Sequence, residues 1–462
     1  MSTLPRHDEI TLPDILRRTP EELRRLQDRL VAETVRLCYR GHPFYRQVMM
    51  RERLSPDDLT GVDDLVKLPI TRKEEYLADP EAFRLRVESL PTVMQTLWEV
   101  CYTTGTTSGV PAPVYTTTFD RQAHLFDCRR RTEFIDIRWG DTIVNLFPLS
   151  SFPMGAYVRA ASEAAACGAS LVFAHTGRPT EPFHVHRSID AAIDLIADHR
   201  ATVLWGIGSF VRRVLNRAEE RSARLPHLRL AMITGEAISV AMQDDIRERM
   251  ARLGSIAAEV VNRYSSTEMG TNMVECLVGS GLHNLSPDQV YLEVVDPDSG
   301  RRLPDGDTGL LAFTHLIRRG TVFLRYAVGD LARLDRSPCP HCGRTTSERV
   351  SGLSRSGNIR KVKGTLVNVQ ALCEAIEEVP GIEEYQVVIQ AGNWRDGSSE
   401  ELVLRIATAS ADAESLSRVV ADRVREIAHV SPQVVLATRE ELFDGDLRAK
   451  PQRVVDTRPT NH

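Results

Sequence analysis

The stretch Tyr102–Thr117, YTTGTTSGVPAPVYTT, gathers small hydroxyl side chains around two glycines and then reaches proline. Apolar residues precede it in VMQTLWEVCY and follow it in APVYTT, which predicts a loop between two strands. Such a loop is either a surface turn or a cradle for phosphate, because small residues let backbone N–H groups and hydroxyls approach phosphate oxygens closely. The GxxxxGK(S/T) spacing of a Walker loop is missing, so the rest of the chain must decide.

The composition is that of an ordinary globular protein. The chain has 462 residues, 42% hydrophobic and 26% charged side chains, and a formal net charge of −5. This length accommodates two or three hydrophobic cores, since single cores stop growing at roughly 250–300 residues. The charge favours no nucleic-acid partner. Neither a secretory signal, a membrane-spanning run nor a disulfide framework is apparent, so we expect a cytoplasmic protein that acts away from membranes.

Helical and strand patterns divide the chain into regions. Residues 19–40, TPEELRRLQDRLVAETVRLCYR, predict an amphipathic helix capped by Thr19. Farther along, apolar runs such as TIVNLFPL, SLVFAH, TVLWGI and LRLAMITG alternate with helical segments, which predicts βαβ units and a mostly parallel sheet. From Val290, strands separated by DPDSG and PDGDTG turns predict an antiparallel subdomain.

The sequence pattern changes after the segment SRSGNIRKVKG at residues 354–364, which is rich in glycine, serine and charged residues. Beyond it the pattern predicts a compact α+β unit of about a hundred residues. We therefore predict an α/β protein with a large N-terminal domain over residues 1–354, a hinge at 355–358 and a small C-terminal domain over 359–462.

Five ordered motifs carry a resemblance to adenylate-forming enzymes, the superfamily of acyl-CoA synthetases, adenylation domains and luciferase. They are TTGTTSGVP (103–111), NRYSSTEMG (262–270), RYAVGDLARL (325–334), SRSGNIRKVKG (354–364) and AKPQRVVDTR (449–458). The last motif, with HPFYRQVM, DDLVKLPITRKEEY and ECLVGSGLH, is similar to the phenylacetate–CoA ligase-like branch. The resemblance runs from about His42 to Arg458 and implies that the small C-terminal domain is a mobile lid.

The resemblance implies roles for individual residues. The opening loop would wrap the β- and γ-phosphates of ATP through Thr103, Thr104, Gly105, Thr106, Thr107 and Gly109. The remaining contacts with the nucleotide would come from Gly235, Glu236, Tyr264, Ser265, Asp330, Arg355 and Lys363. Within this set Tyr264 would stack on adenine, and Asp330 would accept the ribose hydroxyls. Thr267 and Lys450 would touch the α-phosphate, and Glu268 would hold Mg²⁺, a hard cation that suits a carboxylate.

Each of these residues also has a plainer interpretation. Tyr264 suits a half-buried strand, Glu268 suits a helix N-terminus, Asp330 suits a turn, and Lys450 suits exposure to solvent. The chain also departs from the family pattern. Val110 stands where a lysine is common, Gly357 and Asn358 replace an acidic hinge pair, and Pro451 follows Lys450, which leaves the contact of Lys450 with phosphate open.

A second constellation is typical of a metal site. Cys339-Pro-His-Cys342-Gly places two thiolates two residues apart, and Zn²⁺ takes four sulfur or nitrogen ligands. In the branch that the chain resembles, Cys276 and His283 supply the other pair, with His341 as an alternative fourth ligand. Without metal, Cys276 would be a buried thiol and His283 a ligand-binding side chain. The other cysteines are expected in the core: Cys38, Cys101, Cys128, Cys167 and Cys373.

The function that the resemblance implies is ATP- and Mg²⁺-dependent activation of a carboxylic acid to an acyl-adenylate, followed by transfer to coenzyme A. Transfer to a carrier-protein thiol or to an amine is one alternative, and a nucleotide- and zinc-binding protein without activity is another. The acid pocket is expected from Phe147–Tyr157, Trp205–Phe210 and Thr234–Ile238. Phe152, Trp205, Gly206 and Gly208 suit a flat aromatic acid, or equally a packed core. A monomer or a homodimer is expected.

Overall fold

The computed structural model describes residues 14–103, 111–147, 155–176, 187–236, 238–355, 359–362, 365–391, 400–408, 410, 412–428, 430–443 and 453–458. Its N-terminal region is helical, as predicted, with α2 (Pro20–Gly41), α3 (Pro43–Arg51) and α4 (Lys73–Ala78). Short 3-10 turns accompany them at Ile15–Arg17, Pro56–Asp58, Asp64–Lys67, Pro80–Phe83 and Thr92–Met94. The predicted cap of α2 is confirmed, because Glu22 N donates to Thr19 Oγ1 (3.2 Å) and Thr19 N donates to Glu22 Oε2 (2.9 Å).

The centre of the molecule is an 11-stranded sheet in the order β10-β11-β12-β13-β9-β8-β7-β6-β5-β3-β4. Its parallel part contains β3 (Thr142–Asn145), β4 (Ser170–Phe173), β5 (Val203–Ile207), β6 (Leu230–Thr234) and β7 (Glu259–Tyr264). Every residue of β5 is buried, since strands in the middle of a parallel sheet are covered on both faces. The predicted βαβ alternation is confirmed.

The antiparallel part continues the same sheet. It contains β8 (Met273–Glu275), β9 (Leu282–Asn284), β10 (Val290–Val295), β11 (Thr308–His315), β12 (Tyr326–Asp335) and β13 (Arg349–Arg355). Pairing turns antiparallel at β7–β8, before the predicted change at Val290. β8 and β9 have three residues each, which is too short for their alternating pattern to be recognised in the sequence.

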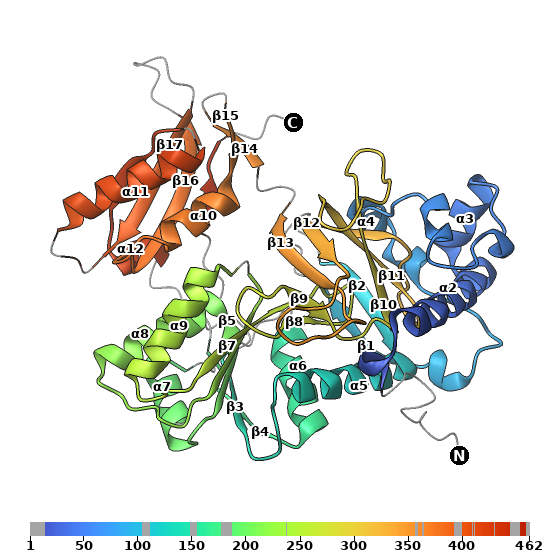
Figure 1. Ribbon diagram of the computed structural model, residues 1–462, viewed down its shortest axis with the longest axis horizontal. Helices are drawn as coiled ribbons and strands as arrows, with labels where there is room; N and C mark the ends of the chain where they lie inside the picture. The colour runs from blue at the N-terminus through green and yellow to red at the C-terminus, as the bar shows by residue number, and fades with distance from the viewer. Residues whose placement is uncertain are drawn as a thin grey trace.

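Helices cover the parallel strands. α5 (Thr118–Phe134) packs on α6 (Gly155–Cys167), while α8 (Gly208–Glu220) packs on both α7 (Ile189–Asp198) and α9 (Val240–Arg252). Figure 1 shows the parallel strands between these two groups of helices. None of the helices in the described ranges is both long and apolar enough to cross a membrane.

The opening loop joins two strands, as predicted. β1 (Leu97–Tyr102) and β2 (Pro113–Thr117) form an antiparallel pair outside the large sheet. At the end of the pair, Thr103 N donates to Ala112 O and Ala112 N donates to Thr103 Oγ1, both at 3.0 Å. The hairpin thus brings both sides of the loop to one point.

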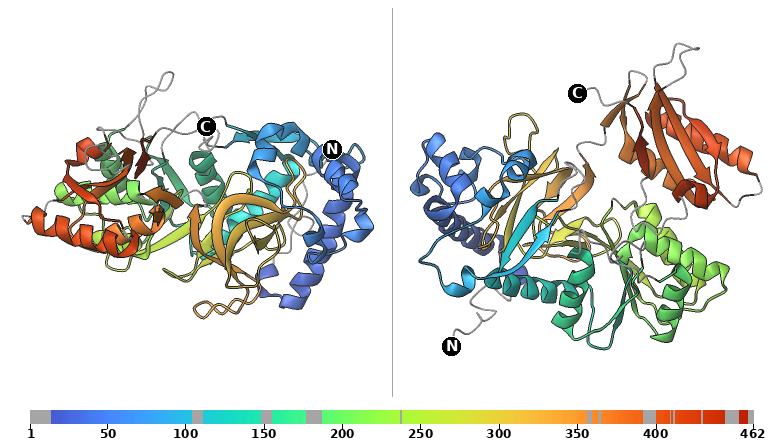
Figure 2. Two further views of the ribbon diagram at one scale, coloured as in Figure 1. Left: turned by 90° about the horizontal axis from the view of Figure 1, so that it is seen from above. Right: turned by 180° about the vertical axis from the view of Figure 1, so that it is seen from behind.

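The C-terminal region forms sheets of its own. β14 (Ile359–Val362) pairs with β15 (Thr365–Asn368), and a four-stranded sheet has the order β18 (Gln433–Leu436), β17 (Glu400–Ala407), β16 (Glu384–Ala391) and β19 (Val454–Asp456). The helices are α10 (Val369–Glu377), α11 (Ala413–Ala428) and α12 (Arg439–Phe443). This C-terminal lobe has a separate hydrophobic cluster. It lies at the opposite end of the molecule from α2 and α3 (Figures 1 and 2).

Hydrogen bonds join the C-terminal lobe to α8 and α9. Ser239 Oγ donates to Glu377 Oε2 at 2.6 Å, at the contact between α9 and α10. The guanidinium of Arg212 donates to the carbonyl oxygens of Ile382 (3.2 Å) and Glu383 (3.0 Å). In this arrangement α10 is held beside the carboxyl ends of the parallel strands.

Candidate active site

Two adjoining cavities open at the carboxyl ends of the parallel strands, where ligands bind in α/β sheets. We call the first the β12 cavity, after Asp330, and the second the α5 pocket, after the helix that forms one wall. Thr234, Gly235 and Ser265 line both of them, so the two cavities meet at the ends of β6 and β7.

The β12 cavity brings together residues that three separate motifs predicted. Tyr264 Oη donates to Asp330 Oδ2 at 2.6 Å, and the Asp330 side chain is buried. The register of β12 and β13 places Arg355 opposite Asp330. Gln370 and Glu374 of α10 also line the cavity, so the C-terminal lobe contributes one wall. Asp330 lies within a strand, which is not the turn of its plainer interpretation.

A tight turn after β6 forms the boundary between the cavities. Gly235 has a φ of +91°, a conformation that side chains other than glycine rarely adopt. Glu236 follows and accepts hydrogen bonds from Ser209 N (2.6 Å) and Ser209 Oγ (3.1 Å). Burial raises the pKa of the Glu236 carboxyl, although these hydrogen bonds oppose the shift. The turn thus lines the β12 cavity with a carboxyl group held in place by α8.

The segment after β7 is a turn that its own hydroxyls stabilise. Ser265 Oγ donates to Thr271 O at 2.6 Å, and Thr267 lines the α5 pocket. Glu268 is buried and lies 3.3 Å from Lys73 Nζ of α4. Because this segment is not a helix, the plainer interpretation of Glu268 as a helix N-terminal acid is wrong. Its carboxylate already meets a cation, so a second cation there would compete with Lys73.

Several predicted site residues lie outside the described residues. They are Thr104, Gly105, Thr106, Thr107, Gly109, Lys363 and Lys450, together with the hinge and acid-pocket residues Gly357, Asn358 and Phe152. Thr103, at the end of β1, is the one member of the predicted phosphate loop that the structure describes, and it is buried.

The α5 pocket has an apolar wall formed by Phe147 and Trp205. Their rings meet edge to face, with centroids 6.3 Å apart and an interplanar angle of 78°. The predicted acid-pocket residues Phe147, Trp205, Thr234 and Gly235 all line this pocket. Gly206 instead packs in the core, because a Cβ there would come within 2.9 Å of Val211 and 3.2 Å of Leu146.

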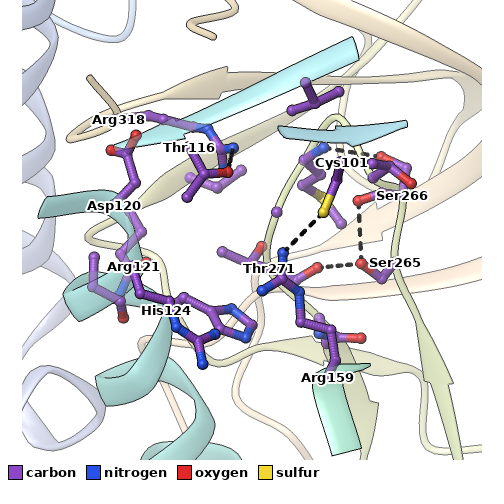
Figure 3. A pocket seen from close by; sticks show the side chains of 18 of the residues that line it. Cys101, Thr116, Asp120, Arg121, His124, Arg159, Ser265, Ser266, Thr271 and Arg318 are labelled. Atoms are coloured by element: carbon purple, nitrogen blue, oxygen red, sulfur yellow. Dashed lines mark hydrogen bonds between the residues drawn. The ribbon is translucent and has the colours of Figure 1, made fainter. Parts of the chain in front are cut away.

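Charged side chains form another part of the α5 pocket, and the sequence did not single them out. Arg121, Arg159 and Arg318 line the pocket together with Asp120 and His124. Figure 3 shows these side chains around the pocket. The sequence offered only a weak indication of these residues. Arg121 and His124 are three residues apart at the start of a helix and therefore share one face.

Backbone N–H groups donate hydrogen bonds to the Asp120 carboxylate. It accepts hydrogen bonds from the N–H groups of Thr117 (2.9 Å), Arg319 (2.8 Å) and Gly320 (2.8 Å). Asp120 therefore fastens β2 and α5 to the chain after β11, and its charge is compensated locally. The guanidinium groups give the pocket its remaining charge.

Four potential metal ligands converge beside the antiparallel strands. One ligand atom each from Cys276, His283, Cys339 and Cys342 lies within 4.8 Å of all the others. Cys276 Sγ is 3.8 Å from Cys339 Sγ, and Cys342 Sγ is 3.7 Å from His283 Nε2. A tetrahedron with Zn–S distances of about 2.3 Å has S–S edges of about 3.8 Å, so the spacing fits zinc.

A hydrogen-bond chain orients the imidazole of this cluster. Ser347 Oγ donates to Asn284 O at 2.8 Å and lies 3.2 Å from His283 Nδ1. Since its proton points at Asn284, Ser347 Oγ accepts from Nδ1–H, which leaves the Nε2 lone pair facing the thiols. The predicted alternative ligand His341 is not one of the four converging residues.

Most of the remaining cysteines lie where expected. Cys38, Cys128 and Cys373 are buried. Cys167 is partly buried, at the end of α6. Cys101 corrects the expectation of a core position, because it lines the α5 pocket and its Sγ lies 3.5 Å from Arg159.

Comparisons with known proteins agree with this geometry. A family model described as "AMP-binding enzyme" matches residues 19–326. Phenylacetate-coenzyme A ligase of Thermus thermophilus is 27% identical over 417 residues, covering 88% of this chain and 87% of that protein. Phenylacetate-coenzyme A ligase of Aromatoleum evansii is 26% identical over 461 residues, covering 97% of each.

The fold has a close counterpart among solved structures. That of 2-hydroxyisobutyryl-CoA ligase in the postadenylation state, in complex with R3-HIB-AMP, has a TM-score of 0.80. It is 22% identical and covers 98% of this chain and 94% of that chain. Together, the comparisons confirm the resemblance and the fold that the ordered motifs predict, and with them the prediction of an AMP-forming ligase.

Proposed function

The chain belongs to the AMP-binding enzyme family, and on that basis we propose that it activates a carboxylic acid as an acyl-adenylate and then transfers the acyl group to coenzyme A. The observation that carries the proposal is the junction of the two cavities at Thr234, Gly235 and Ser265. A nucleotide in the β12 cavity and an acid in the α5 pocket would meet there, with the carboxylate facing the α-phosphate.

The β12 cavity supports nucleotide binding by its polar side chains. Asp330 would accept hydrogen bonds from the ribose hydroxyls, and Tyr264 would pack against the adenine while its hydroxyl holds Asp330 in place. Gly235, Glu236, Ser265 and the backbone around Arg355 would complete the enclosure. In-line transfer at phosphorus depends mainly on such positioning and on charge neutralisation.

Phosphate binding would rest on the loop that follows Thr103 and on Glu268. Mg²⁺ usually keeps several waters and binds one or two carboxylates together with substrate phosphates. Glu268 would be one such carboxylate, with Lys73 moving aside. Thr267 would contact the α-phosphate and the ammonium of Lys450 would offset its charge, as the family motifs imply.

The C-terminal lobe would act as the lid in this scheme. Its separate hydrophobic cluster and the contribution of α10 to the β12 cavity support a domain that closes over the nucleotide. We place the domains at residues 1–354 and 359–462, with the hinge at 355–358. A lid that rearranges between the two half-reactions would use Lys450 for adenylation and Lys363 for thioester formation.

Zinc would stabilise the protein rather than take part in the reaction. The cluster fits Zn²⁺ by the type, number and spacing of its ligands, and Ser347 orients His283 from outside. Four protein ligands leave no position for a substrate, which is the usual form of a structural site. The ion would tie the Cys339–Cys342 turn to the β8–β9 hairpin.

The direct test is carboxylate-dependent exchange of labelled pyrophosphate into ATP, with Mg²⁺ present, across a panel of aromatic, fatty and amino acids. We expect exchange with at least one aromatic acid and formation of a thioester once coenzyme A is added. Exchange without thioester would point to a carrier protein or an amine as the acceptor. No exchange with any acid would favour a nucleotide-binding protein that lacks activity.

A further inference from the structure

Where α5 and α6 meet, a corner of the α5 pocket is lined by two guanidinium groups whose charges repel each other. Arg121 comes from the first turn of α5 and Arg159 from α6. Arg159 donates to the carboxylate of Glu99 on β1. Arg121 Nη1 donates instead to the neutral Ser162 Oγ at 2.8 Å. Among the described residues, no carboxylate lies within ion-pair distance of Arg121.

The electrostatics of this corner are unfavourable as it stands. Burial lowers the pKa of Arg121, and the neighbouring Arg159 lowers it further, while Glu99 opposes the shift. Burial and the charges of Arg159, Arg131 and Arg121 hold the pKa of His124 well below its usual range. Half-buried like charges, only one of which is paired with a carboxylate, repel each other unless a further anion joins them.

The buried indole of Trp205 forms part of the wall of this pocket. Trp205 is buried, and its Nε1–H has no hydrogen-bond partner in the described part of the chain. Arg263 covers the Trp205 ring at 4.9 Å, so the indole is fixed in place. Because the Nε1 atom itself has almost no accessible surface, the part of Trp205 that lines the pocket is its apolar ring.

We propose that the acid activated by this enzyme carries a second anionic group, a carboxylate in the simplest case, and that Arg121 and Arg159 bind it. This rests on the proposed function, in which the first carboxylate lies where the two cavities meet. The apolar wall of Phe147 and Trp205 would cover the carbon frame between the two anionic groups. The preferred substrates are then dicarboxylic acids, with an aryl or a short alkyl body.

The position of the arginines favours the acid over the nucleotide as their ligand. Arg121, His124 and Arg159 line the α5 pocket and are absent from the described lining of the β12 cavity. Guanidinium groups bind carboxylates through two parallel N–H···O bonds, which gives geometric selection as well as energy. Arg159 is paired with Glu99, whereas the guanidinium of Arg121 has no carboxylate partner among the described residues and can pair with an anionic group of the acid.

The experiment compares matched pairs of acids in pyrophosphate exchange. The pairs are phenylacetate with its 3- and 4-carboxy derivatives, benzoate with isophthalate, and hexanoate with adipate. We expect kcat/KM to be higher for the dicarboxylate in at least one pair, by about tenfold or more. Arg121→Met should lower that preference by about ten- to a hundredfold, and Arg121→Lys by less, since it keeps the charge.

The control is Arg129→Met on the same helix. Arg129 is exposed and pairs with Glu133 at 3.0 Å, so its loss should leave the preference unchanged. Thermal unfolding establishes that each variant is folded, and Arg121→Gln replaces Arg121→Met if the latter is not. Preference for the monocarboxylate in every pair, or an equal loss for both members in the Arg121 variants, would overturn the inference. Absence of exchange with all these acids and with the wider panel of aromatic, fatty and amino acids would instead contradict the proposed function.

Discussion

The β12 cavity and the α5 pocket share three residues but differ in how their chemistry is encoded. Tyr264 and Asp330 of the β12 cavity lie in short motifs that the sequence identifies. Arg121 and Arg159 of the α5 pocket lie in no such motif and come from two helices. The nucleotide is the same for every adenylating enzyme, whereas the acid differs. Residues that bind the common nucleotide can therefore be recognised as short motifs. Residues that bind the acid come from separate elements and are brought together only in the folded protein.

The largest effect is expected where the phosphates would bind, which concerns every acid alike. Glu268→Gln should lower exchange by about a hundred- to a thousandfold if Glu268 is the proposed Mg²⁺ ligand, because that ligand would be lost at the point where charge develops. Exchange rates measured with several acids at saturating ATP check this. The control is Lys73→Met, which removes the ion pair with Glu268 but keeps the carboxylate. If both variants lose activity equally, the role of Glu268 is to pair with Lys73.

A smaller effect, again common to all acids, is expected in the β12 cavity. Asp330→Asn should lower kcat/KM for ATP by about ten- to a hundredfold, since hydrogen bonds to a charged acceptor are worth about 1.5–3 kcal/mol. Tyr264→Phe keeps the ring and removes the 2.6 Å hydrogen bond to Asp330, so a loss of less than about tenfold is expected. A change in acid preference in either variant would show that the two cavities are not separate in function.

Substitution of a residue in the cysteine cluster should lower thermal stability rather than activity. Cys342→Ser should reduce bound zinc to less than about half an equivalent and lower Tm by several degrees, because a metal that binds only the folded state stabilises it. Metal analysis and thermal unfolding measure the two effects, and Cys167→Ser provides a variant outside the cluster. Full zinc content with unchanged Tm in Cys342→Ser would mean that the cluster holds no metal.

The smallest effect is expected at Trp205. Trp205→Phe keeps an aromatic ring beside Phe147 and Arg263 but removes the buried Nε1–H. Preference for a dicarboxylate over its monocarboxylate partner should change by less than a few fold, because the apolar wall is kept and the Nε1 atom is enclosed by the protein. Measured ratios of kcat/KM decide this. A larger fall in preference would mean that the indole N–H contacts the second anionic group.

The sequence predicted the parts of the fold that depend on local pattern. The capped helix α2, the alternation of strands and helices and the β1–β2 hairpin all follow from periodicity and turn residues. The antiparallel continuation of the same sheet was less accessible, because β8 and β9 have three residues each and too little periodicity to be recognised.

Prediction of the candidate site from the sequence was limited for a different reason. Cys339 and Cys342 could be singled out by their spacing, which is typical of a zinc site, whereas Cys276 and His283 followed only from the resemblance to the ligase branch. Arg121 and Arg159 could not be singled out, since arginines on amphipathic helices are usually exposed and paired along the helix, as Arg129 is with Glu133. What distinguishes Arg121 is a neutral partner, Ser162, on another helix, and this contact exists only in the folded chain.

One binding measurement tests most directly whether the two cavities form a single acid-activating site. Calorimetry compares AMP with a stable analogue of the adenylate, the N-acylsulfamoyl adenosine of 4-carboxyphenylacetate. The account predicts that Asp330→Asn weakens both ligands, whereas Arg121→Met weakens only the acyl analogue, by about ten- to a hundredfold. If Arg121→Met weakened AMP as much as the analogue, or weakened neither, the assignment of nucleotide and acid to the two cavities would be contradicted.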